Sequence, residues 1–103
     1  MTDRELLELA AKAAGIDIKF FNSSGEAVVA IPGYPESCLV ESWNPLTDDG
    51  DALRLMSTLA MDVICHSYYV EVDSISEDWA ADRCITMRRA IVRAAAEIGR
   101  TMA

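Results

Sequence analysis

The side chains with the most potential for covalent or metal chemistry in this 103-residue chain are three cysteines and one histidine. Cys65 and His66 are adjacent, and a thiol beside an imidazole is a pairing that nucleophilic catalysis uses. The sequence shows no third group to orient the base, and zinc sites usually bring their ligands in close pairs such as C-x2-C. We therefore expect no catalytic residue, no metal and no cofactor, and we expect Cys38, Cys65 and Cys84 to be buried thiols.

Three aspartates, Asp48, Asp49 and Asp51, form an acidic run that could hold a divalent cation. The run lacks the spaced ligands and the distal glutamate of an EF-hand loop. Helix capping accounts for the same residues, because Asp48 is a good N-cap and the other two place negative charge where a helix dipole is positive. We favour capping, and we also keep these three residues as a candidate acidic contact surface.

Arginines near the carboxyl end form the second charged feature. Residues 83–103 carry a net charge of +4, whereas residues 1–82 carry −12. Arg89, Arg93 and Arg100 fall on one side of the helix predicted there. A row of charges on a helix is usually solvated, but in this chain it could also meet the acidic part of another copy. These three arginines are therefore candidate contact residues.

Aromatic side chains are the other pointer to an interface, since Trp and Tyr are favoured anchors in protein contacts. Tyr34 and Tyr69 are expected outside the core. A domain of this size also needs bulky core residues, and that reading is favoured for Trp43 and Trp79. We nevertheless keep Trp43 with the two tyrosines as candidate contacts.

The first elements are the most clearly predicted part of the chain. Apolar residues recur at helical spacing over Asp3 to Ala14, which predicts a helix. Thr2 and Glu5 form a capping box at its start, and Gly15 supplies the left-handed residue that ends it. Three strands are predicted next, the first two as a hairpin around a turn; their ranges are 18–21, 27–31 and 38–43.

The second half begins with a helix after Asp48, followed by a second hairpin or bent strand pair around His66. The last helix is predicted over about Trp79 to Thr101, with Ser76 or Asp78 as its cap. The stripe expected to be buried on this helix is Ala80, Cys84, Met87, Ile91, Ala95, Ile98 and Met102.

This order predicts one α+β domain over residues 1–103, with three helices packed on a four- to five-stranded, mainly antiparallel sheet as a layered α/β sandwich. A hydrophobic content of 51% is too high for a disordered chain. No apolar run approaches the 18 residues of a membrane span, and we expect no export signal, so a cytoplasmic location follows. A net charge of −8 argues against direct nucleic-acid binding.

Three blocks of the chain carry a resemblance to a known family. They are DRELLELAAKAAG at 3–15, WNPLTDDGDALRL at 43–55 and RRAIVRAAAEIG at 88–99. In these blocks the chain resembles the phage ABA sandwich domain family of small phage and prophage proteins. In layout it is more loosely similar to the NinX-like accessory proteins of lambdoid phages. The resemblance implies a layered α/β domain in the cytoplasm of a bacterial host, and it carries over no catalytic residues.

Three functional hypotheses follow. The first is a non-enzymatic phage or prophage accessory protein that binds a protein partner, including a second copy of itself. The second is an acidic inhibitor of a host nucleic-acid enzyme or defence complex, in which the carboxylates occupy a site meant for phosphates. The third is an enzyme or metal protein that uses Cys65, His66 and an acidic cluster. The absence of catalytic motifs favours the first hypothesis.

Overall fold

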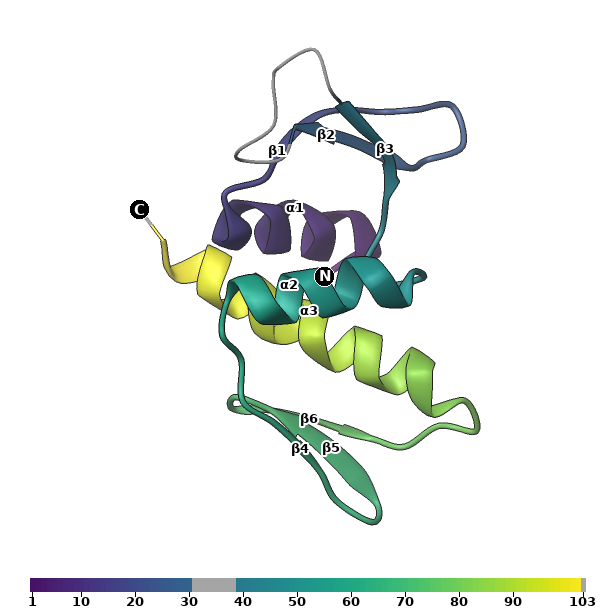
Figure 1. Cartoon of the computed structure of the whole chain (residues 1–103), viewed down its shortest axis with the longest axis vertical. Coiled ribbons are helices and arrows are strands. Elements are labelled where there is room, and N and C mark those ends of the chain that lie inside the picture. Colours follow the sequence, from purple (N-terminus) through teal and green to yellow (C-terminus); the bar gives the residue numbers. More distant parts are fainter. Residues whose placement is uncertain (31–38, 103) are drawn as a thin grey trace.

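Three helices form the middle layer of the molecule, and a small sheet lies on each side of them (Figure 1). The computed structural model describes residues 1–30 and 39–102, with side chains for residues 1–30 and 42–102. The helices are α1 (Asp3–Ala14), α2 (Asp49–Thr58) and α3 (Arg83–Thr101). The strands are β1 (Asp17–Phe21), β2 (Ala27–Ala30), β3 (Leu39–Trp43), β4 (Val63–Cys65), β5 (Tyr69–Val72) and β6 (Ile75–Asp78).

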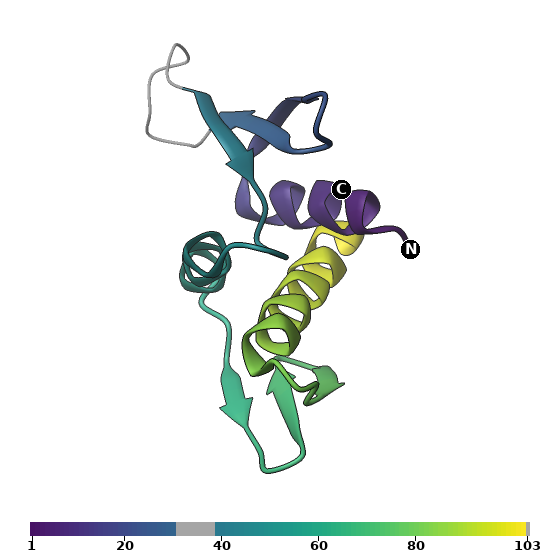
Figure 2. The same cartoon turned by 90° about the vertical axis from the view of Figure 1, so that its right-hand side faces the viewer.

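The strands form two sheets, so the α+β class is confirmed but the single sheet of four or five strands is not. The first sheet has the order β1-β2-β3 and the second β4-β5-β6, and all neighbours are antiparallel. The physical reason is the position of α2, which follows β3 and leads into β4. Because α2 carries the chain past the helical layer, the second set of strands meets the opposite side of that layer (Figure 2).

The N-caps predicted for the first two helices and the glycine that ends α1 are present, with the Thr2 half of the predicted capping box. The Thr2 side chain accepts a hydrogen bond from the Glu5 amide at 3.1 Å, and Gly15 ends α1 with a φ of 72°. The Asp48 side chain caps α2 by accepting from the Asp51 amide at 2.8 Å. These hydrogen bonds are local, which is why adjacent residue types are enough to predict them.

The predicted start of the last helix is wrong. Residues 75–78, which include both predicted caps, form the edge strand β6, where Val72 pairs with Ile75 across a tight turn. Asp73 adopts a φ of 52° in that turn, a conformation that aspartate tolerates better than most residues. The helix begins only at Arg83. Its N-cap is Asp82, whose side chain accepts a hydrogen bond from the Cys84 amide at 2.9 Å.

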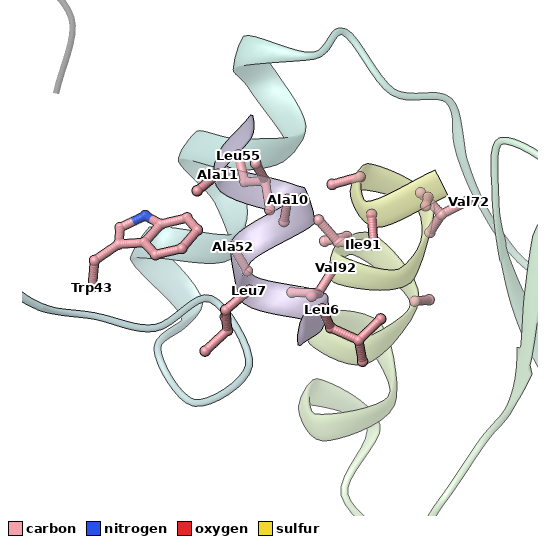
Figure 3. Packing of buried hydrophobic residues seen from close by; sticks show 14 of the residues in the cluster. Leu6, Leu7, Ala10, Ala11, Trp43, Ala52, Leu55, Val72, Ile91 and Val92 are labelled. Atoms are coloured by element: carbon pink, nitrogen blue, oxygen red, sulfur yellow. The ribbon is translucent and has the colours of Figure 1, made fainter. Parts of the chain in front are cut away.

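The core lies where α1, α2 and α3 converge (Figure 3). Ala10 and Ala95 are fully buried, and Gly99 on α3 lies against the backbone oxygen of Leu9 on α1. Small residues at these positions let the two helices approach closely. Val70 and Val72 of β5 close the core from the side of the second sheet.

Burial on α3 is broader than the predicted stripe, because the helix packs against α1, α2 and the second sheet at once. Ile91 and Ala95 of the stripe are buried, Met87 and Ile98 are partly buried, and Ala80, Cys84 and Met102 are exposed. The residues buried on α3 are Thr86, Ala90, Ile91, Val92, Ala94, Ala95, Ala96 and Gly99.

The prediction of buried thiols is wrong for two of the three cysteines. Cys65 ends the short edge strand β4, and Cys84 lies in the first turn of α3; both are exposed. Cys38 lies outside the described residues. None of the helices in the described part of the chain combines the length and apolar character that a membrane span requires.

Candidate functional site

The acidic run is largely engaged within the fold. Asp51 is only 7% exposed, and its carboxylate accepts from the Asn44 amide at 3.0 Å and from Arg54 Nη2 at 2.7 Å. Asp48 caps α2 and lies 4.0 Å from the same arginine. Asp51 is therefore not part of an exposed contact surface, and that part of the prediction is wrong.

The third aspartate of the run is paired with a distant residue. Arg88 on α3 donates from Nη1 to Asp49 Oδ1 at 2.5 Å and from Nε to the backbone oxygen of Leu46 at 2.8 Å. One guanidinium group thus holds the turn before α2 against α3. In residues 1–30 and 39–102, no group of three or more His, Cys, Asp or Glu side chains is placed to hold a metal ion.

The three candidate arginines have acidic partners inside the chain. Arg93 lies 2.9 Å from Glu77 on β6, and Arg89 lies 3.4 Å from Asp3. The third pair is within α3, where Arg100 Nη2 lies 2.8 Å from Glu97. Part of the charge expected to attract another copy is therefore balanced locally.

The candidate aromatic residues separate into different environments. Trp43 is 3% exposed and belongs to the core, so its assignment as a contact residue is wrong. Tyr69 is partly buried, and its ring stacks on the His66 ring at a centroid distance of 4.3 Å. Tyr34 lies outside the described residues.

Cys65 and His66 do not come together as a catalytic pair. The imidazole Nε2 is buried, lies 3.5 Å from Glu71 Oε1 and has its ring against Tyr69. Cys65 instead lines a separate hollow between α2 and α3, together with Cys84. The strand end places the two neighbours in different surroundings, as alternation along a strand predicts.

Leu53, which sequence reasoning did not single out, is an exposed apolar side chain of the described residues that lines two hollows. This α2 residue is 57% exposed, and it stands between two hollows that it helps to line. Because an exposed leucine alone is common, the two hollows beside it are what make this position distinctive. We call Leu53 and the two hollows the α2 surface.

The larger hollow, the Met87 hollow, has a volume of about 600 Å³. Its walls come from α2, β4, the segment before α3 and the first turns of α3. Met56 and Met87 contribute flexible thioethers, and Trp79 contributes an aromatic wall. Trp79 is fixed by a hydrogen bond from Nε1 to the His66 backbone oxygen at 2.7 Å, and Arg83 lies 5.1 Å over its ring.

The smaller hollow, the Trp43 hollow, has a volume of about 450 Å³ and lies on the other side of Leu53, which forms a ridge between the two hollows. Ala14 and Ile16, at the end of α1 and just after it, form one wall. The exposed side of α2 forms the other with Leu53 and Ser57. The α2 surface therefore consists of one apolar ridge between two hollows with mainly apolar walls.

One signal in the sequence could have indicated this surface. The apolar stripe of α2 includes Ala52 and Leu55, which are buried. Leu53 falls outside that stripe, at 100° from Ala52. A leucine beyond the buried stripe of an otherwise amphipathic helix is expected to be exposed. The hollows themselves depend on α1, β4 and α3, so no local pattern predicts them.

Comparison with known proteins gives no further guide, because no family model, curated protein or solved structure matches the chain.

Proposed function

We propose that the chain is a non-enzymatic protein-binding module that uses the α2 surface to bind its partner. The observation that carries this proposal is the exposed Leu53 ridge between two apolar hollows. Fully burying a leucine side chain is worth about 1.5–3 kcal/mol. Leu53 is 57% exposed, so a protein partner that covers it would gain roughly half of this free energy.

The side chains of the Met87 hollow suit a protein contact. Methionines adapt to the shape of a partner because they are unbranched and polarizable. Tryptophan is among the residues that contribute most to binding energy in interfaces. Met56, Met87 and Trp79 are all partly buried, so part of each side chain is still accessible to a partner.

The proposal includes an accessory role for a phage or prophage in the bacterial cytoplasm. Its support is the resemblance of the blocks at 3–15, 43–55 and 88–99 to the phage ABA sandwich family. The inhibitor hypothesis has less support, because Asp51 is buried and Asp49 is paired with Arg88. Few of the carboxylates in that run are free to imitate phosphates.

Site-specific photo-crosslinking in bacterial cells tests the proposed function. A photoreactive amino acid at Ser57 lies on the exposed side of α2, and the matched control places it at Ser23 in the turn between β1 and β2. We expect a discrete protein adduct from position 57 only, and we expect Leu53→Asp to abolish it. The captured protein, purified, should bind the wild-type chain and not the Leu53→Asp variant.

Two results would contradict the proposed function. One is an equal set of adducts from positions 57 and 23, which indicates random collision. The other is an adduct from position 57 that persists unchanged with Leu53→Asp. Because Leu53 is exposed, the variant should fold normally, and circular dichroism checks this before the crosslinking is interpreted.

A further inference from the structure

We infer that the α2 surface is covered by a second copy of the chain, in a twofold dimer with the two α2 helices facing each other. This inference rests on the proposed function and names its partner. In a twofold contact the same patch is used by both copies, so the patch must be complementary to itself. The shape of the α2 surface is the argument for self-complementarity, and its low net charge and open position are compatible with it.

The shape is self-complementary because a ridge and hollows lie side by side. Leu53 stands between the Met87 hollow and the Trp43 hollow, and it contributes to the wall of both. When the surface is rotated onto itself about an axis beside Leu53, the ridge of one copy meets a hollow of the other. Each copy then supplies one protruding side chain and one recess, and two equivalent apolar contacts form.

The charge of this surface suits contact between two acidic molecules. The whole chain carries −8, so two copies repel each other when they approach at random. The residues that line the two hollows include the arginines Arg54, Arg83 and Arg88 and one acid, Asp49. Two of these arginines are balanced by Asp51 and Asp49. The α2 surface is therefore far less acidic than the chain as a whole.

The position of α2 leaves room for a second copy. The main contact of this helix is with α3, whereas α1 and α3 pack extensively against each other. In the view of Figure 2, α2 lies at one side of the molecule and is seen end on, with neither sheet covering its outer side. A facing α2 from another copy would pack against this helix from outside.

Sedimentation equilibrium over a range of protein concentrations tests the inference. We expect the wild-type chain to be a dimer and Leu53→Asp to raise the dimer dissociation constant by about 100-fold or more, since both symmetric contacts lose their ridge. The matched control is Phe20→Asp on β1. Phe20 is 54% exposed, which is similar to Leu53, but it lines neither hollow. This control should leave the dissociation constant within about twofold of wild type.

The natural thiols supply a second measurement. Cys65 and Cys84 are exposed in the single chain and line the Met87 hollow. If a second copy covers this hollow, their alkylation should slow as the protein concentration rises. The dependence on concentration should disappear in Leu53→Asp and persist in Phe20→Asp. Mass spectrometry of the peptides reads each thiol separately.

The outcomes separate this inference from the proposed function. A wild-type chain that stays monomeric at all concentrations, or a dimer unaffected by Leu53→Asp, overturns the inference. If such a chain still captures a different protein through position 57 in a manner dependent on Leu53, the proposed function stands. If it captures none, both are wrong.

Discussion

Gly99 on α3 lies so close to α1 that a Cβ atom at this position would be 2.0 Å from the backbone oxygen of Leu9. Backbone cannot move aside as a flexible side chain can, so the glycine sets the distance between the two helices. The contact lies in the most extensively packed helix pair of the fold. We therefore regard Gly99 as the residue on which the α1–α3 packing depends most.

Gly99→Ala should lower the free energy of unfolding by about 1–3 kcal/mol or more, because overpacking forces the helices apart. Alanine has the higher helix propensity, so a loss here can come only from the tertiary contact. Gly50→Ala in α2 is the control, since its added Cβ would meet only side-chain ends of Asp48 and Arg54, at 3.2–3.4 Å. Urea unfolding followed by circular dichroism should show Gly50→Ala near wild type or more stable.

The true start of α3 gives a second prediction. Asp82→Ala should cost about 1 kcal/mol, because it removes the side chain that accepts from the Cys84 amide. Asp78→Ala should change the free energy of unfolding by less than about 0.5 kcal/mol, since Asp78 is an exposed residue at the end of β6. Thermal or urea unfolding measures both. A larger loss of unfolding free energy from Asp78→Ala than from Asp82→Ala would indicate that the helix begins near Trp79, as the sequence predicts.

The elements that the sequence predicts correctly are those defined by neighbouring residues. Thr2 and Asp48 cap helices through bonds to amides three residues away, and Gly15 ends α1 alone. The start of α3 could not be found in the same way. A tight turn at Asp73 turns the segment that follows into β6, and Asp82 then caps the helix, although Ser76 and Asp78 have equally suitable side chains.

The division of the strands into two sheets depends on tertiary structure. So does whether each candidate contact residue is exposed, buried or paired within the chain. Nothing local shows that α2 places the second hairpin on the far side of the helices. Arg93 is paired because Glu77 lies on β6, a strand that the sequence pattern does not reveal. Leu53 was recognisable as an apolar residue outside its stripe, but the hollows beside it require α1, β4 and α3.

A third prediction concerns the buried carboxylate of Asp51. Asp51→Asn keeps the shape but turns one of the two acceptor oxygens into an amide donor that faces either the Asn44 amide or Arg54. We expect a loss of about 1–3 kcal/mol in the free energy of unfolding, because a buried polar group loses its partner. Asp17→Asn is the control, since its ion pair with Lys19 is exposed, and exposed pairs contribute at most about 1 kcal/mol. Equal losses at the two positions would contradict the role assigned to Asp51.

The last prediction distinguishes the two tryptophans, one in the core and one in the Met87 hollow. Trp79→Phe leaves Trp43 as the only tryptophan, and because Trp43 is 3% exposed, its emission should be blue-shifted and weakly quenched by acrylamide. A neutral quencher is needed because the net charge of −8 repels anions such as iodide.

The wild-type chain contains Trp79 as well, so it should be quenched more strongly at low protein concentration. If a second copy covers the α2 surface, this extra quenching should fall as the protein concentration rises. In Leu53→Asp it should not change with concentration. Strong quenching of Trp79→Phe would instead show that Trp43 is exposed and would contradict its place in the core.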